Sequence, residues 1–280
     1  MKLNAKHISA ASDLCALLET DTPGSIRPLI LAAHPDDETL GATSLLAHFS
    51  LAEVAILTDG APRSERFRSA LPSVTRSEYA AIRRQEALQA LACASISPDR
   101  VHHFDCIDQE VIHHVPELVP RFAEILRQSQ IDRLVTHAYD GGHPDHDAAA
   151  LIAHLALSTL KRDKNEVPTL FEMALYHGRE GSLVTGEFLN HSPHEIVLEL
   201  TPCERELKQR MLACYTSQQD VLRSFGVEVE RLRPALSYDF TEAPHSGELW
   251  YEHLDFPTRG TEWRESAMAT LQKFDQVLCR

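Results

Sequence analysis

The segment PLILAA, residues 28–33, is an unbroken apolar run, and charged residues follow it at once. Such a run is typical of a strand buried on both faces, as in a parallel sheet between two layers of helices. The next residues, HPDDE, supply a histidine and three acids, and apolar residues at helical spacing follow as far as residue 49. A buried strand, a polar turn and a helix therefore begin the predicted fold.

Strands and helices are predicted to alternate along the rest of the chain. Further strands are predicted at residues 53–60, 100–106, 169–178 and 195–201. Helices are predicted at residues 8–18, 38–49, 77–93, 116–130, 203–222 and 261–278, and a strand, a polar turn and a helix share residues 131–160. This alternation predicts an α/β fold with a mostly parallel sheet and helices on both faces. Sheets of this kind bind ligands at the carboxyl ends of their strands, where two clusters of histidine and aspartate are predicted to lie.

Composition narrows the class of protein. The 280 residues are 43% hydrophobic and 24% charged, as in ordinary globular proteins, and residues 1–280 are expected to form a single domain. The formal net charge of -14 argues against nucleic acid as a partner. No apolar stretch approaches the roughly 20 residues that span a bilayer, and no signal-peptide pattern is present, so a cytoplasmic protein without membrane association is expected. The oligomeric state is left open, a homo-oligomer included.

Three residues offer donor atoms for a metal ion: His34, Asp37 and His146. The six cysteines form no CxxC pair, so a catalytic zinc site with three ligands and one open position fits better than a closed thiolate site. A nicotinamide cofactor is not expected, because no GxGxxG follows the first strand. For the second cluster, an ordinary helix start is the alternative, since Pro144 and Asp145 suit a first helical turn.

The motifs AHPDDETLG and GGHPDHDA together resemble the PIG-L/LmbE-like family of N-acetylglucosaminyl deacetylases. LTDG, RRQEA, LACYTSQ and ELWYE fit the same pattern, so the resemblance covers about residues 28–252. It implies a Rossmann-like fold and removal of an acetyl group from a small N-acetylated amino sugar or glycoconjugate. It also implies that His34, Asp37 and His146 bind Zn²⁺, although Fe²⁺ or Co²⁺ could occupy the same donors.

The resemblance also implies roles in catalysis. Asp36 becomes the general base that takes a proton from water, and His143 the electrophilic or acidic partner. Protonated His143 would stabilise the oxyanion, and Asp145 would orient it and keep it charged; a solvent-facing helix acid is the alternative for Asp145. Arg83 is placed near the substrate, with an exposed helical ion pair to Glu86 as the alternative.

The rim of the predicted site departs from the family pattern. Some relatives have a tyrosine shortly before the second histidine motif, whereas Gly141 and Gly142 directly precede His143 here. Tyr139 cannot be assumed to replace that tyrosine, and the glycines are expected to give backbone freedom and room for a substrate. Residues 58–60 are expected to border the pocket. ELWYE is expected to form an ordinary late strand in which Trp250 serves packing.

Two other functions stay open at this stage. A metal phosphohydrolase of the HD type is suggested by the adjacent His146 and Asp147, but its usual framework is largely helical. A non-catalytic module that binds metal or glycan is the other alternative. Phosphate release would favour the first, and binding without turnover the second.

Overall fold

The structure is a computed structural model, and it describes residues 6–8, 26–68, 71 and 73–278. The predicted helix at residues 8–18 lies outside the described residues except for Ile8, which ends a short strand, β1. None of the helices in these ranges combines the length and the apolar character that crossing a bilayer requires.

One large sheet organises the molecule, with its strands in the order β1-β9-β10-β6-β5-β2-β3-β4. The bounds of these strands are β1 Lys6–Ile8, β2 Pro28–Ala32, β3 Glu53–Thr58, β4 Val101–Cys106, β5 Arg133–His137, β6 Thr169–Met173, β9 Ile196–Glu199 and β10 Val229–Pro234. Only β10 runs antiparallel to its neighbours, β6 and β9. From β2 the chain moves outward through β3 and β4, and it then returns to β5 and continues to β6 on the other side. This doubly wound order confirms the predicted Rossmann-like, mostly parallel α/β fold.

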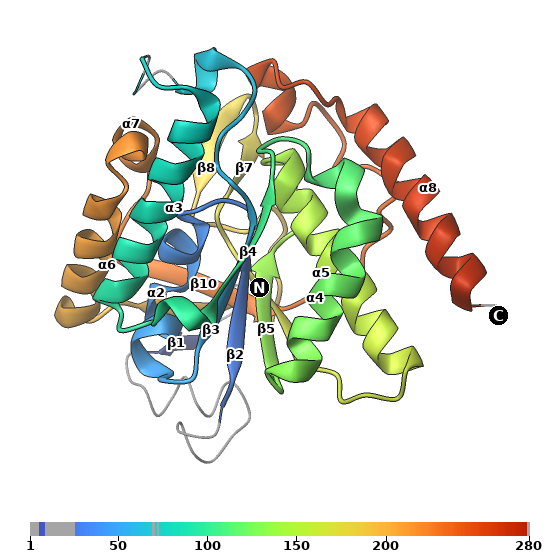
Figure 1. Ribbon diagram of the computed structural model, residues 1–280, viewed down its shortest axis with the longest axis horizontal. Helices are drawn as coiled ribbons and strands as arrows, with labels where there is room; N and C mark the ends of the chain where they lie inside the picture. Colours follow the sequence, from blue (N-terminus) through green and yellow to red (C-terminus); the bar gives the residue numbers. More distant parts are fainter. Residues whose placement is uncertain (1–5, 9–25, 69–70, 72, 279–280) are drawn as a thin grey trace.

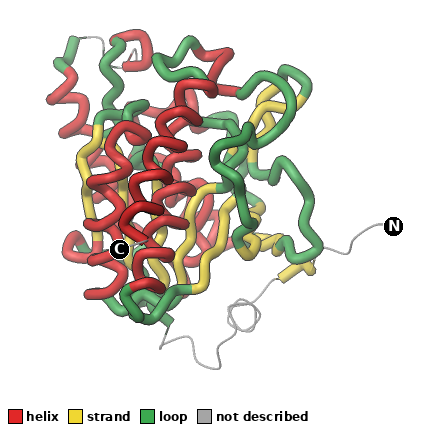
Figure 2. The backbone as a smooth tube through the Cα atoms, turned by 90° about the vertical axis from the view of Figure 1, so that its right-hand side faces the viewer, coloured by secondary structure: helices red, strands yellow, loops and turns green. Residues whose placement is uncertain are grey.

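Helices cover both faces of the sheet (Figure 1). One layer holds α2 Asp37–His48, α3 Arg76–Cys93 and α6 Pro202–Cys214, and the other holds α4 Val115–Gln128, α5 Pro144–Arg162 and α8 Gly260–Leu278. Figure 2 views the molecule from the side of the second layer, with its helices in front of the strands. Each layer packs its apolar residues onto one face of the sheet, which produces two separate cores.

The apolar run at the start of the chain explains why β2 is central. Leu29 and Leu31 belong to the core under α4, α5 and α8, whereas Ile30 and Ala32 belong to the core under α2, α3 and α6. All four side chains are fully buried. Because successive side chains in a strand point to opposite faces, only an unbroken apolar sequence satisfies both cores.

Three predicted elements are wrong in detail. The helix expected at 203–222 ends at Cys214, and the 3-10 turn Thr216–Gln218 and the short helix α7 Gln219–Leu222 follow. The buried carboxylate of Glu86 explains the break, because it accepts hydrogen bonds from both side-chain hydroxyls and one backbone N–H of the turn.

The other two differences concern strands. The strand expected at 169–178 divides into β6 and β7 Tyr176–Arg179, which forms a separate hairpin with β8 Ser182–Thr185. ELWYE is not a strand: it enters the 3-10 turn Trp250–Leu254. The backbone N–H of Trp250 donates to the carbonyl oxygen of Gly141, which fixes this turn against the loop after β5.

Candidate active site

The predicted site residues gather where the direction of winding reverses. β2 and β5 are adjacent and parallel, and the chain leaves their carboxyl ends toward opposite sides of the sheet. Such a switch point leaves a crevice between the two departing loops. His34 follows β2, and His143 caps α5 after β5, so both clusters reach the crevice from rigid elements.

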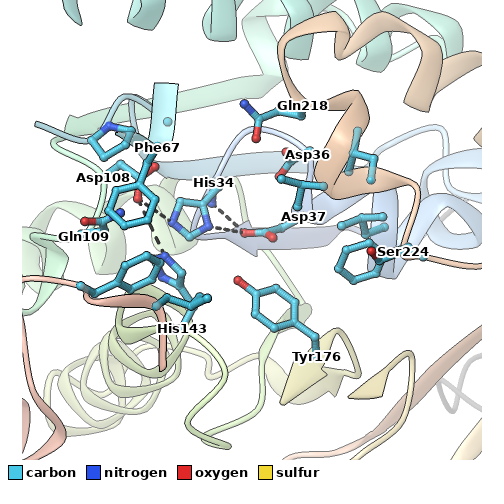
Figure 3. Close-up of a pocket in the computed structure, with 18 of the residues that line it drawn as sticks. His34, Asp36, Asp37, Phe67, Asp108, Gln109, His143, Tyr176, Gln218 and Ser224 are labelled. Atoms are coloured by element: carbon cyan, nitrogen blue, oxygen red, sulfur yellow. Dashed lines mark hydrogen bonds and ion pairs between the residues drawn. The ribbon is translucent and has the colours of Figure 1, made fainter. Parts of the chain in front are cut away.

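His34, Asp37 and His146 converge in this crevice (Figure 3 labels the first two). His34 Nδ1 lies 3.3 Å from Asp37 Oδ2, and His146 Nε2 lies 3.3 Å from Asp37 Oδ1. The ring centroids of the two histidines are 5.2 Å apart. All three side chains are buried, so residues more than 100 positions apart in the sequence meet here as predicted.

The donor chemistry of this cluster fits a zinc ion. Three overlapping groups could hold a metal, and each includes one or two of the expected ligands: His34, His143 and His146; Asp37, His137 and His146; and His34, Asp108, His143 and Asp145. His137 Nε2 already accepts a hydrogen bond from the N–H of Ala33, and His143 Nδ1 accepts one from the N–H of Asp145. His146 Nε2 is buried and has no hydrogen-bond partner among the described residues, and the same is true of His137 Nδ1. Buried imidazole nitrogens and carboxylate oxygens are typical zinc ligands.

Asp36 stands at the start of α2 in a strained conformation, with φ 139° and ψ -25°. Its carboxylate accepts a hydrogen bond of 3.0 Å from Nη2 of Arg83, which also donates to the carbonyl oxygen of Pro35. Its backbone N–H donates to the carboxylate of Glu38. Burial raises the pKa of Asp36 to about 7, although the positive charge of Arg83 opposes this rise. The surrounding contacts therefore hold the backbone of Asp36 in an unfavourable conformation. Its buried carboxyl group has a pKa near neutral pH.

Asp145 contacts a different histidine from the one expected. Its carboxylate lies 3.2 Å from Nε2 of His34 and accepts the backbone N–H groups of Gln109 and Val111, so it orients His34. Burial alone would lower the pKa of His34, but Asp108, Asp145 and Asp37 together raise it well above its usual value. The solvent-facing alternative for Asp145 is wrong, because this side chain is fully buried.

His143 is placed as a neutral side chain. Its Nδ1 accepts the backbone N–H of Asp145, which requires an unprotonated nitrogen and leaves the proton on Nε2. Burial, followed by the nearby His34 and His146, lowers the pKa of His143 well below its usual value. The expected imidazolium, held charged by Asp145, is therefore corrected to a neutral imidazole.

Arg83 is buried, with only 2% of its residue surface exposed, so its ion pair with Glu86, at 3.6 Å between Nη1 and Oε2, is present but is buried rather than exposed. Its guanidinium lines the pocket, and the Nε and Nη1 atoms have no hydrogen-bond partner within the described part of the chain. Gly60 also borders the pocket, as expected, whereas Asp59 pairs with Arg76. Gly60 has φ 62°, and a Cβ atom there would meet Arg83 Nε at 2.8 Å.

Gly141 and Gly142 allow other parts of the chain to pack closely and do not open space for a substrate. Gly141 has φ 73°, which favours glycine, and a Cβ on Gly142 would collide with the carbonyl oxygen of Tyr176. Tyr139 does not reach the pocket: its hydroxyl donates to the carbonyl oxygen of Glu242. The close approach at Gly142 instead brings Tyr176 to the site, where its ring lies 4.9 Å from the ring of His146.

Three residues of this site were missed from the sequence. Asp108 lies 3.3 Å from Nε2 of His34, and His137 stacks on His146 with ring centroids 4.0 Å apart. Both stand at or just beyond the carboxyl end of a strand, so the rule that ligands bind there could have found them. Tyr176 begins β7, in the third of the chain where strand directions could not be predicted.

The cluster opens into a cavity of about 370 Å³. His34, Asp36 and Asp37 lie at its base with Arg83, Asp108 and His143, and Trp250 joins its wall instead of only packing. The stick view shows His34 and Asp37 in contact at the centre, with the Tyr176 hydroxyl pointing toward them (Figure 3). The cavity can therefore hold a small molecule against a buried cluster of histidines and aspartates and the carboxyl group of Asp36.

Comparisons with known proteins agree with this description. Residues 29–157 match the family model described as GlcNAc-PI de-N-acetylase, PIG-L. The deacetylase of the antimicrobial reagent A40926 pseudoaglycone is 19% identical, with a TM-score of 0.57, and the alignment covers 76% of this chain and 98% of that one. The zinc-inhibited form of teicoplanin deacetylase is 17% identical, with a TM-score of 0.55 and coverage of 76% and 99%.

A third solved structure, N,N'-diacetylchitobiose deacetylase from Pyrococcus horikoshii with an inhibitor, is 17% identical, with a TM-score of 0.54 and coverage of 84% and 94%. At these identities the likeness shows a shared fold. No protein with curated annotation matches the chain at a significant level. Residues 29–157, which carry both histidine motifs, thus match the PIG-L family model, and this confirms the resemblance seen in the sequence.

Proposed function

We propose that this protein is a zinc-dependent N-deacetylase that removes the acetyl group from a small N-acetylated amino sugar or glycoconjugate. His34, Asp37 and His146 are the proposed ligands of the ion, and Fe²⁺ or Co²⁺ suits the same donors. The family match supports deacetylation. The similar structures are of enzymes named for deacetylating a pseudoaglycone, teicoplanin and diacetylchitobiose, which favours a sugar-bearing amide.

One observation carries the proposal. Two histidines and an aspartate from separate strand ends meet beside Asp36, whose pKa of about 7 suits a base that works near neutral pH. A zinc ion bound there would supply Lewis-acid activation of the amide carbonyl and of the attacking water. A structural zinc site would not require such a carboxyl group at the edge of an open cavity.

The residues of the chain divide the proton transfers between them. Asp36 takes the proton from the attacking water, and the protonated carboxyl then gives it to the departing amine. Arg83 keeps Asp36 in place through Nη2 during both steps. His143, held by the N–H of Asp145, directs its Nε2–H into the cavity, where a neutral donor stabilises the negative charge that develops on the carbonyl oxygen.

The HD-type phosphohydrolase is not favoured. Asp147 points away from the cavity, because its Oδ1 accepts the backbone N–H groups of Asp140 and Gly141. Asp147 therefore stabilises the loop after β5 and does not act with His146 as a pair of ligands. The central sheet also differs from a largely helical framework.

Metal analysis combined with an acetate-release screen tests the proposal. Protein purified with a chelator and reloaded with zinc is offered a panel of N-acetylated amino sugars and their glycosides. Acetate release that depends on added metal is expected, with Asp36→Asn as a variant that keeps the metal and loses turnover. Zinc binding without acetate release from any member of the panel would instead support a binding module, and phosphate release would support a phosphohydrolase.

A further inference from the structure

We propose that Tyr215 is a positioning residue for the deacetylation: its hydroxyl holds Glu38, and Glu38 holds Asp36 in the backbone conformation that turns the Asp36 carboxyl group toward the cavity. This inference rests on the proposed function and adds to the site a residue from outside the cavity. Tyr215 does not itself contact a substrate, because its side chain is fully buried and it is not among the described residues that line the cavity.

The backbone of Asp36 is the first observation. Its φ of 139° lies in a region that glycine enters freely and that other residues rarely adopt. The other non-glycine residues with positive φ in the described ranges have values of 51–75°, close to the ordinary left-handed conformation. A backbone as unfavourable as that of Asp36 persists only where surrounding contacts hold it, and such contacts are often part of a mechanism.

The direction of the Asp36 side chain is the second observation. Asp36 is the N-cap of α2, where an aspartate ordinarily accepts a hydrogen bond from the first turn of the helix. Its side chain accepts none from that turn, all of which the structure describes. The carboxyl group instead lines the cavity and pairs with Arg83. The unusual φ and the missing cap therefore have one result, which is that the carboxyl group is available to a substrate and not to the helix.

Glu38 holds the backbone N–H of Asp36, and Tyr215 holds Glu38. The side chain of Glu38 is fully buried, and its Oε2 accepts the N–H of Asp36 at 3.1 Å. Its Oε1 accepts the hydroxyl groups of Tyr215 and Thr39. A buried carboxylate that lacks donors is costly, so the Tyr215 hydroxyl both stabilises Glu38 and fixes its direction. A shift of Glu38 would release the N–H of Asp36.

The turn that follows Tyr215 supports the other contact of Asp36. Glu86 accepts three hydrogen bonds of 2.7–2.8 Å from the two residues after Tyr215. Arg83, one turn earlier on α3, donates to the carboxylate of Asp36, and its guanidinium carbon lies 5.8 Å from the centre of the Tyr215 ring. The segment at Tyr215 is therefore tied to Asp36 twice, through the backbone N–H and through the carboxylate.

Kinetics of Tyr215→Phe test the proposal, because this change removes the hydroxyl and keeps the ring. In the zinc-loaded protein, kcat for acetate release is expected to fall about 10- to 100-fold while KM stays within about twofold, since a displaced base slows the reaction of a substrate that is still bound. Tyr139→Phe is the matched control: it removes the hydroxyl of another buried tyrosine, which donates to the carbonyl oxygen of Glu242, and both constants should stay at native values. A native kcat in Tyr215→Phe, or an equal fall in both variants, would overturn the proposal.

A double variant tests the route through Glu38. Glu38→Ala removes the group that joins Tyr215 to Asp36, and far-UV circular dichroism checks that the variant folds. If Tyr215 acts through Glu38, adding Tyr215→Phe to Glu38→Ala lowers kcat by less than about twofold, because the two changes remove the same support. A further fall as large as that of Tyr215→Phe alone would show an independent route and contradict the proposal. If Glu38→Ala does not fold, the comparison of Tyr215→Phe with Tyr139→Phe decides.

A stability comparison separates this inference from the proposed function, because it needs neither substrate nor metal. Asp36→Gly and Asp36→Ala both remove the carboxylate and differ in the cost of the backbone at residue 36. The glycine variant is expected to melt at the higher temperature, the reverse of the usual order, because alanine is strained at a φ of 139°.

Adding Tyr215→Phe to both variants should narrow this gap in melting temperature, because residue 36 is then free to relax. An unchanged gap, or an alanine variant that melts at or above the glycine variant when Tyr215 is present, would overturn the proposal. A narrowed gap in a protein that releases no acetate would count against the proposed function and would still support the hold of Tyr215 on residue 36.

Discussion

Replacing Arg83 with methionine removes the cation that faces Asp36. In the native protein both side chains are buried, with 2% and 10% of their surfaces exposed, and Nη2 of Arg83 lies 3.0 Å from Asp36 Oδ2. Breaking a buried ion pair by removing one partner costs about 3–5 kcal/mol when the remaining group stays ionised, and protonation of Asp36 lowers this cost. For a chain of this size the full cost corresponds to a fall in melting temperature of roughly 10 °C, which is the upper limit for this variant.

The loss is expected to depend on pH. The pKa of Asp36 is about 7 in the folded protein and about 3.9 in an unfolded chain, so its ionisation lowers stability above the unfolded value. Without Arg83 the folded pKa rises further, and the variant keeps its proton where the native protein has lost it. The difference in unfolding free energy therefore grows from pH 5 to pH 8, by up to about 1.4 kcal/mol per pH unit once Asp36 is ionised in the native protein.

Thermal unfolding of the metal-free proteins at pH 5, 7 and 8 measures this difference. Arg84→Met is the matched control, because Arg84 and its partner Asp105 are 48% and 57% exposed, and an exposed pair contributes at most about 1 kcal/mol. Equal melting temperatures for Arg83→Met and Arg84→Met at pH 8, or a difference that shrinks as pH rises, would refute this reasoning about the buried pair.

Three further outcomes are expected. Asp36→Asn should lower kcat by about 10²- to 10⁴-fold while bound zinc, measured by atomic emission, stays at the native level; native turnover would remove Asp36 from its role. His146→Ala should lose bound zinc while the far-UV circular dichroism spectrum is preserved, and a full zinc content would exclude it as a ligand. Gly142→Ala should reduce both kcat/KM and the melting temperature, because the added methyl group collides with the carbonyl oxygen of Tyr176. Native values for both would show that residue 142 and the Tyr176 carbonyl group are not in tight contact.

Much of the fold was accessible from the sequence because local patterns decide it. The apolar run 28–33 has to be buried on both faces, and the polar turn that follows has to end the strand, so a parallel sheet with a site at its edge follows. The convergence of the two histidine motifs was predictable for the same reason: each motif is short, and each is tied to the end of a strand.

What the sequence could not supply depends on contacts between distant segments. Glu86 breaks the helix expected at 203–222 by binding the turn at Thr216 and Ser217, an interaction across some 130 residues. Asp145 faces His34 rather than its neighbour in the sequence, His143, because the loop after β4 supplies N–H groups that hold the carboxylate there. The direction in which a side chain points at the start of a helix is set by its hydrogen-bond partners from other segments and not by its spacing along the sequence.

The most direct test of the proposed metal centre is an anomalous difference map from crystals of the zinc-loaded protein, recorded on both sides of the zinc absorption edge. A single peak is expected about 2.0–2.2 Å from Nδ1 of His34, Nε2 of His146 and an oxygen of Asp37. A peak bound through His137, or no peak in crystals of protein that still releases acetate, would contradict it.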